Sequence, residues 1–137
     1  MKIFFDSSAF AKRYVDEKGS DKVERLCGKA SALALSVISP PEIVSALNRR
    51  LREGSLSRSQ YRDAKARLSL EVADATIVNL LPAVVADAIR ILETNPVRAM
   101  DALHVACALQ WDTELFVSSD SRQLKAARKA KLRTRQV

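Results

Sequence analysis

Short apolar runs alternate along this chain with stretches of helical periodicity. The apolar runs cover residues 3–5, 32–38, 75–80 and 114–118. Helical patterns cover residues 7–14, 21–29, 42–52, 57–72, 82–93, 99–111 and 123–130. Alternation of this kind is typical of parallel strands joined by helical crossovers, which place helices on both faces of a sheet. The sequence therefore predicts an α/β fold, a three-layer α/β/α sandwich around a central, mostly parallel sheet of four to five strands.

Local signals support several of the predicted helices. Ser57 and Gln60 form a capping-box pattern, and the prolines at positions 40 and 41 are tolerated in a first helical turn. The residues after Lys131 show no clear pattern, which leaves open whether they form a strand. In the helix over residues 82–93 we expect five apolar side chains to face the core, namely Val84, Val85, Ala88, Ile89 and Leu92.

Nothing in the chain suggests more than one structural unit. No repeat, low-complexity segment or linker interrupts it, so residues 1–137 are expected to form a single domain. The apolar runs are far too short to cross a bilayer, and the strand at the very start leaves no room for a signal peptide. We therefore expect a cytoplasmic protein that has no membrane-spanning segment. Cys27 and Cys107 are isolated and are expected to be small buried residues.

The charge balance favours a polyanionic partner. Lys and Arg number 23 against 16 for Asp and Glu, which gives a net charge of +7 and a pI near 9.8. Nucleic acid is the commonest partner for such a surplus. The competing interpretation is that the charge serves only solubility.

Four acidic residues occupy special positions relative to the predicted sheet. Asp6 and Asp120 each follow a buried strand directly, and Glu42 lies in the first turn of the helix after the second strand. Asp101 lies in the first turn of the most apolar helix. Taken singly, each could serve as a helix cap or complement the helix dipole. Because open parallel sheets gather their ligand sites at the carboxyl ends of the strands, we expect all four acids at one edge.

Four carboxylates in one cleft would repel one another and raise each other's pKa unless a cation neutralised them. Their hard oxygen atoms suit Mg²⁺, with Mn²⁺ as a substitute. Such a site can activate water and stabilise charge on a phosphodiester. Together with the basic surplus, the four acids predict metal-dependent hydrolysis of nucleic acid.

The chain resembles the PIN-domain family and, within it, the VapC-type ribonuclease toxins of toxin–antitoxin modules. The resemblance rests on four motifs in the family's order, which span nearly the whole chain. They are Phe4-Phe5-Asp6-Ser7-Ser8, Pro41-Glu42-Ile43 with Ala46-Leu47, residues 98–106 (RAMDALHVA), and Phe116-Val117-Ser118-Ser119-Asp120 with residues 124–127 (LKAA) behind it.

The resemblance implies a catalytic and metal-binding quartet of Asp6, Glu42, Asp101 and Asp120 that holds Mg²⁺ or Mn²⁺. It implies that Ser118, which stands where the family frequently has Thr, supports the site. It also implies an endoribonuclease that cuts single-stranded or looped RNA, usually as a homodimer. The further partner would be a small antitoxin whose C-terminal segment wraps the toxin and blocks its cleft.

Other residues of the motifs are assigned supporting roles. Ser7 follows the first acid. His104, the single histidine, lies one turn from Asp101; we favour a structural role for it over that of a general base. Arg98 could equally contact a phosphate or pair with a carboxylate. The basic residues after Asp120 are interpreted as a track for RNA rather than as a merely solvated face.

Three alternatives compete with the toxin hypothesis. An aspartyl-phosphate hydrolase would use Asp6 as a nucleophile, but such chemistry usually has a second acid two residues on, where this chain has Ser8. A catalytically silent PIN-like module would bind RNA or protein only, and loss of one or more acids would be its signature. A PIN nuclease could also act in RNA processing outside a toxin–antitoxin pair.

Overall fold

The computed structural model describes all residues 1–137 and contains one sheet of five parallel strands. Their spatial order is β3-β2-β1-β4-β5, with every neighbouring pair parallel. The strands are β1 (Lys2–Phe5), β2 (Ala32–Ser36), β3 (Thr76–Val78), β4 (Leu115–Ser118) and β5 (Thr134–Gln136). The predicted α/β class is confirmed, and the tail after Lys131 does add a strand.

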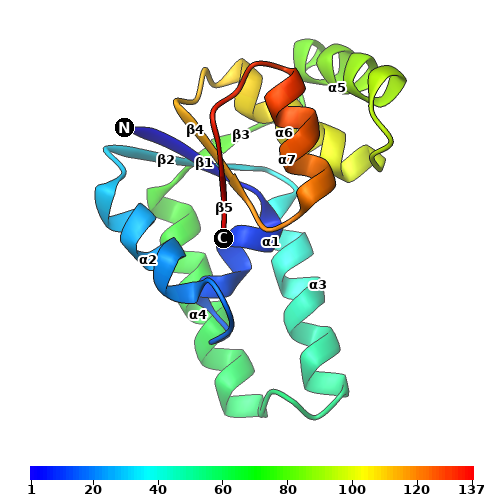
Figure 1. The fold of residues 1–137 in the computed structure, drawn as a ribbon. Helices are drawn as coiled ribbons and strands as arrows, with labels where there is room; N and C mark the ends of the chain where they lie inside the picture. The colour runs from blue at the N-terminus through cyan, green and yellow to red at the C-terminus, as the bar shows by residue number, and fades with distance from the viewer.

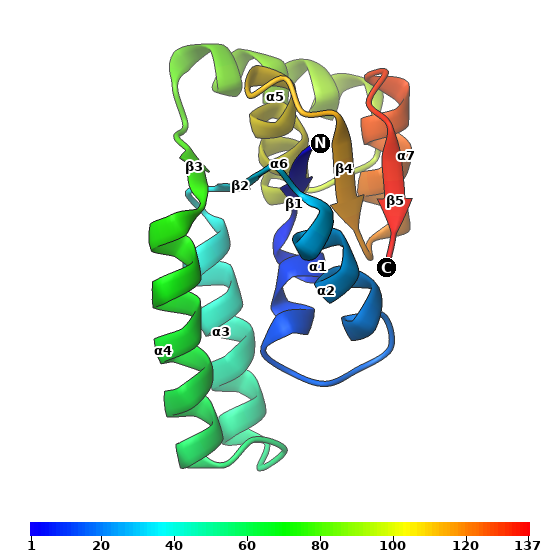
Figure 2. The same cartoon turned by 90° about the vertical axis from the view of Figure 1, so that its left-hand side faces the viewer.

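Helices cover both faces of the sheet (Figures 1 and 2). They are α1 (Ser7–Phe10), α2 (Ser20–Lys29), α3 (Ser39–Arg52), α4 (Arg58–Asp74), α5 (Pro82–Thr94), α6 (Ala99–Gln110) and α7 (Ser121–Lys129), with a 3₁₀ turn η1 (Ala11–Arg13) after α1. In both views α3 and α4 run as an antiparallel pair that extends beyond the sheet. None of the helices is long and apolar enough to span a bilayer.

Side-chain alternation along the strands divides the core into two layers. Phe4 and Phe116 point to one face, where their rings stack 5.9 Å apart between centroids and pack against α5, α6 and α7. Ile3, Phe5 and Val117 point to the opposite face and pack against α1 to α4. Because the central strands are buried on both faces, they read as continuous apolar runs in the sequence. In β1, at the centre, Ile3, Phe4 and Phe5 are therefore fully buried.

Several predicted boundaries shift in the structure. The helix expected over residues 7–14 is a single α-turn followed by η1, and the strand expected over 32–38 ends at Ser36. The strand expected over 75–80 is limited to β3, and α3 begins at Ser39, so that both prolines lie in its first turn. The Ser57–Gln60 capping box is present: Ser57 Oγ accepts from the Gln60 amide at 3.1 Å, and Gln60 Oε1 accepts from the Ser57 amide at 2.8 Å.

One prediction for α5 is wrong. Val84 and Ala88 are buried as expected, but Val85, Ile89 and Leu92 face solvent, with 43%, 52% and 38% of their surface exposed. The buried third position is Ile91. Because α5 is apolar on two sides, its periodicity could not distinguish the face that meets α6 from the face that meets water.

The stacked pair of Phe4 and Phe116 makes a stability prediction. Substitution Phe116→Ala would leave a cavity at the centre of the sheet and is expected to lower the free energy of unfolding by about 3–5 kcal/mol. Leu70→Ala, at a position that is 72% exposed, is the control and should change it by less than about 0.5 kcal/mol. Urea denaturation measures both, and equal losses would contradict the assigned core.

Candidate functional site

The first acid of the motif set, Asp6, is buried at the end of β1 with 1% of its surface exposed. Its carboxylate caps α1 by accepting from the Ala9 amide at 2.9 Å. It also accepts from Ser8 Oγ at 2.8 Å and from Ser118 Oγ at 2.6 Å. Burial raises the pKa of Asp6, while the nearby His104 and these hydrogen bonds oppose the rise. Asp6 is thus both a helix cap and a carboxylate fixed in the sheet.

Ser118, the last residue of β4, joins two of the acids. It is fully buried, and its hydroxyl donates to Asp6 and accepts from the Asp120 amide at 2.9 Å. Asp120 then caps α7, where its Oδ1 accepts from the Arg122 amide at 2.9 Å and the Gln123 amide at 3.4 Å. The end of β4 therefore positions Asp6 and Asp120 through a single hydroxyl group.

Glu42, in the first turn of α3, is held by two donors. Ser7 Oγ donates to Glu42 Oε1 at 2.7 Å, and His104 Nε2 lies 2.6 Å from the same oxygen. His104 is 2% exposed, and its Nδ1 has no partner. Although partial burial raises the pKa of Glu42, the hydrogen bonds from His104 and Ser7 outweigh it and lower that pKa below its usual value. The contacts suit a supporting role for Ser7 and His104, because both orient Glu42.

Asp101, in the first turn of α6, has a partner that the motifs do not include. Gln123 Nε2 donates to Asp101 Oδ1 at 3.0 Å, and the Arg98 amide donates to Asp101 Oδ2 at 3.3 Å. Gln123 is 3% exposed, and its Oε1 has no partner. Its backbone contacts Asp120 and its side chain contacts Asp101, so Gln123 connects the two acids. In the sequence it resembles any polar residue of an amphipathic helix, and only its burial identifies it. Ser8 is exposed and lies within the first motif, but nothing in the sequence indicates that its hydroxyl donates to Asp6.

Two of the acids share an open cleft of about 340 Å³. Asp101 and Asp120 line it together with Arg98, Arg122, Ser121 and Val97. Neither guanidinium group is paired with a carboxylate. Both are therefore available to a phosphate group that enters the cleft, and for Arg98 this favours phosphate contact over a carboxylate pair.

The acids do not form a preassembled cluster. No group of three or more His, Cys, Asp or Glu side chains is close enough to hold a metal ion together. The carboxylate oxygens of Asp6 and Glu42 instead accept hydrogen bonds from hydroxyl, amide and imidazole donors. Mg²⁺, however, is commonly bound through one or two carboxylates, with water and substrate phosphate as its other ligands. Asp101 and Asp120, which face one cleft, have the donor chemistry that such an ion requires.

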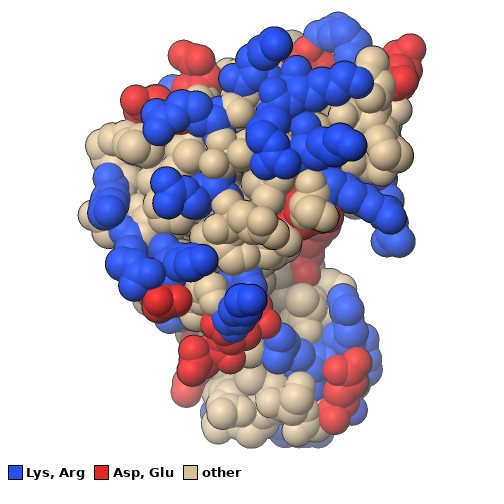
Figure 3. Space-filling model, in the orientation of Figure 1, with Lys and Arg blue, Asp and Glu red and all other residues tan.

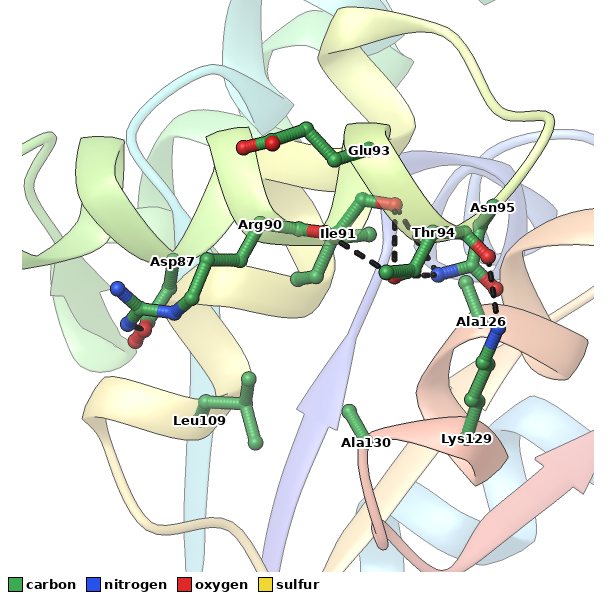
Figure 4. A pocket seen from close by; sticks show the side chains of 10 residues that line it. All are labelled: Asp87, Arg90, Ile91, Glu93, Thr94, Asn95, Leu109, Ala126, Lys129 and Ala130. Carbon is green, nitrogen blue, oxygen red and sulfur yellow. Dashed lines mark hydrogen bonds and ion pairs between the residues drawn. The ribbon is translucent and has the colours of Figure 1, made fainter.

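A second cavity, of about 430 Å³, lies between α5, α6 and α7 (Figure 4). Three of its four charged side chains are engaged within the protein, and only Glu93 has no ion pair or side-chain hydrogen bond. Asp87 pairs with Arg90 and accepts from Gln110, while Lys129 Nζ donates to the Thr94 carbonyl at 2.8 Å. It contains none of the predicted site residues. The cleft at Asp101 and Asp120 is therefore the better candidate for chemistry.

The lowered pKa of Glu42 predicts a pH dependence. A carboxylate whose pKa is depressed by folding stabilises the fold above its unfolded pKa, near 4.5, and loses that contribution as the pH falls through its folded pKa. We expect the stability advantage of the native protein over Glu42→Gln to be constant near neutrality and to shrink below about pH 4.5. Chemical denaturation across pH 3–7 measures it, with the exposed Glu53→Gln as control. An advantage that grew on acidification would contradict the assignment.

The sequence and the fold both match known proteins. Residues 3–129 match the family model for the PIN domain. Two ribonucleases of Mycobacterium tuberculosis strains, VapC45 and VapC49, are each 31% identical to this chain over 107 residues, which cover 78% of this chain and 74% of each relative.

Solved structures share the fold. M. tuberculosis VapC20, described as a sarcin–ricin loop cleaving toxin, superposes with a TM-score of 0.70 at 18% identity, over 90% of this chain and 94% of that one. VapBC2 from Rickettsia felis, bound to a DNA fragment from its promoter, gives a TM-score of 0.71 at 12% identity, over 100% and 99% of the two chains. The chain therefore belongs to the PIN-domain family, among the relatives of the VapC ribonucleases.

Proposed function

We propose that this protein is a metal-dependent endoribonuclease toxin whose active site is the carboxyl edge of the sheet. The observation that carries the proposal is the cleft in which Asp101 and Asp120 face two unpaired arginines. Carboxylates suit a divalent cation and guanidinium groups suit a phosphodiester. The two kinds of group in one cleft suit a nuclease that acts through a metal ion.

Each residue has a role in this proposal. Asp101 and Asp120 would hold Mg²⁺ or Mn²⁺, and Asp6 and Glu42 would complete the site directly or through water. The bound ion would supply Lewis-acid stabilisation of the phosphodiester and lower the pKa of the attacking water. Ser118 and Gln123 fix the acids, while Arg98 and Arg122 orient the phosphate group.

The relatives support RNA as the substrate and an antitoxin as the partner. VapC45 and VapC49 are named ribonucleases. Several proteins of the same fold are known as toxin–antitoxin complexes, including one from Klebsiella pneumoniae with a TM-score of 0.68. By analogy, we propose that this chain cuts single-stranded or looped RNA in the cytoplasm until an antitoxin blocks the cleft. A silent binding module is less well supported, because all four acids are retained.

We further propose that the protein acts as a homodimer through the outer face of α5. This face consists of Leu81, Val85, Ile89 and Leu92, which are 61%, 43%, 52% and 38% exposed. Exposed apolar stripes of this kind mark interaction sites. A single helix face can pair with its own copy about a two-fold axis, and such isologous dimers are the commonest oligomers.

Removal of a carboxylate tests the catalytic assignment. Asp101→Asn and Asp6→Asn are each expected to lower Mg²⁺-dependent RNA cleavage by more than about 100-fold, the scale of a lost electrostatic contribution. Circular dichroism should show an unchanged fold. Asp63→Asn, an exposed acid on α4, is the matched control and should keep full activity. EDTA should stop cleavage by the native protein and Mn²⁺ should restore it.

Other results would redirect the assignment. Undiminished cleavage by both variants would contradict the proposed site. If the native protein with Mn²⁺ produced no new RNA ends beyond the metal-free control, the silent binding module would be favoured instead.

The oligomeric state tests the α5 face. Val85→Asp combined with Ile89→Asp should convert the dimer to a monomer, because two buried, unpaired charges at a symmetric interface are strongly unfavourable. Sedimentation equilibrium measures the mass. Leu70→Asp, an exposed apolar position on α4, is the control. A native protein that is already monomeric at high concentration would disprove this interface.

A further inference from the structure

A small groove of about 170 Å³ lies between α2 and β5. We call it the α2–β5 groove; its lining consists of Lys22, Arg25, Leu26, Lys29 and Arg135. The three cations of α2 fall at positions i, i+3 and i+7 and so share one face of the helix. Lys22 and Lys29 are separated by about 10 Å along the helix axis. Four of the five lining residues thus carry positive charge.

Little negative charge in the protein compensates this cluster. Only Arg25 has an ion pair, to Asp21 at 3.1 Å, and both of these side chains are largely exposed. Lys22, Lys29 and Arg135 have none. Residues 121–137 contain seven Lys and Arg and no Asp or Glu. Mutual repulsion among these cations would be relieved by a bound polyanion.

The groove is part of a wider basic surface. Arg135 of β5 lines the groove on the α2 side of the sheet, and Arg133, which lies two residues earlier and just before β5, is expected on the same side by strand alternation. On the other side, Arg128 of α7 reaches β5, where its guanidinium donates to Thr134 Oγ1 at 3.3 Å. Figure 3 shows Lys and Arg gathered on this face of the molecule over α7, β5 and α2.

This surface begins beside the acidic edge of the sheet. The Val137 amide, just after β5, donates to the carbonyl of Ser118 at 3.2 Å, and Ser118 is the residue that binds Asp6. The start of α2 also lies against Val137. Gly19 has φ +96°, and a Cβ there would lie 2.7 Å from the carbonyl carbon of Val137. An RNA strand that leaves the acidic edge along β5 would therefore meet the groove next.

The composition of the groove favours nucleic acid over a protein partner. The core of a protein interface is depleted in charge and rich in aromatic and apolar residues. The groove has a single apolar residue, Leu26, and no aromatic one. The main stripe of exposed large apolar residues lies instead on and beside α5. A sequence-independent phosphate contact needs only clustered Lys and Arg.

We propose that the α2–β5 groove is an RNA-backbone site outside the catalytic cleft, which holds the strand that flanks the scissile bond. This inference rests on the proposed ribonuclease function and names the surface that binds its substrate. The groove contacts phosphates and carries no base selectivity of its own. Its contribution is therefore to affinity for long RNA and not to the cleavage step.

The test measures RNA binding separately from cleavage. In the Asp6→Asn background, a fluorescent single-stranded 20-nucleotide RNA is titrated at several salt concentrations. The triple variant Lys22→Glu, Lys29→Glu, Arg135→Glu should bind at least about 10-fold more weakly. The slope of log K against log salt should fall by about 2, since each single-strand phosphate contact contributes about 0.7. The corresponding alanine triple, which adds no repulsion, should show the same change in slope.

A matched triple variant controls for net charge. Arg52→Glu, Arg62→Glu and Lys65→Glu make the same charge change at exposed positions of α3 and α4. They should weaken binding much less and leave the slope nearly unchanged. Equal losses of RNA affinity in the two triple variants would contradict the groove as the RNA site. The groove would be a site for an acidic protein segment if the binding of a polyglutamate peptide depended on the groove residues and the binding of RNA did not. That result would also overturn the proposal.

The two levels of the proposal fail in different ways. If the native protein cleaves RNA but the groove triple variant binds and cleaves long RNA normally, the groove is not an RNA site, and the nuclease assignment is unaffected. If the native protein never cleaves, yet the groove triple loses RNA binding with the predicted slope, the nuclease assignment fails and the RNA site stands. With both correct, the groove triple should lose activity on long RNA and keep it on short oligonucleotides.

Discussion

The buried carboxylate of Asp6 is the constraint on which this structure depends most. It stands at the end of the central strand with 1% of its surface exposed, where desolvation strongly disfavours its charge. The fold provides Ser118, Ser8 and the Ala9 amide as donors, and hydrogen bonds to a charged acceptor contribute about 1.5–3 kcal/mol each. This carboxylate, held at such a cost where parallel strands end, is the basis for the proposed role of Asp6 at a metal site in addition to its capping of α1.

The same principle extends around the edge of the sheet. Each of the other acids also has its own donors: Ser7 and His104 for Glu42, Gln123 for Asp101, and the first amides of α7 for Asp120. These contacts orient the carboxylates while keeping them apart, which limits their mutual repulsion. Three separate surfaces result: an acidic edge, a basic side at β5 and α2, and an apolar stripe on α5.

Much of this arrangement was predictable from the sequence, because strand and helix patterns are local. The positions of Asp6 and Asp120 directly after apolar runs predict their place at the carboxyl edge. Gln123 was not predictable, since its contact with Asp101 depends on side chains that meet only after folding. Ser8 contacts Asp6 locally, but its contacts with Ser118 and Ser119 form only on folding. The sequence pattern predicts the exposed face of α5 as core because both sides of this helix are apolar. The residues of β5, Thr134–Gln136, show no strand signal in the sequence, because they owe their conformation to pairing with β4.

The most direct test of the proposed metal site is the position of a bound metal ion. Crystals grown or soaked with Mn²⁺ allow the ion to be located by its anomalous scattering, without reference to any activity. We expect a peak in the cleft lined by Asp101 and Asp120, with carboxylate oxygens within about 2.0–2.2 Å of the ion, as for a small octahedral cation. Manganese bound only elsewhere, for example at the cavity between α5, α6 and α7, or no site at all at millimolar Mn²⁺, would contradict it.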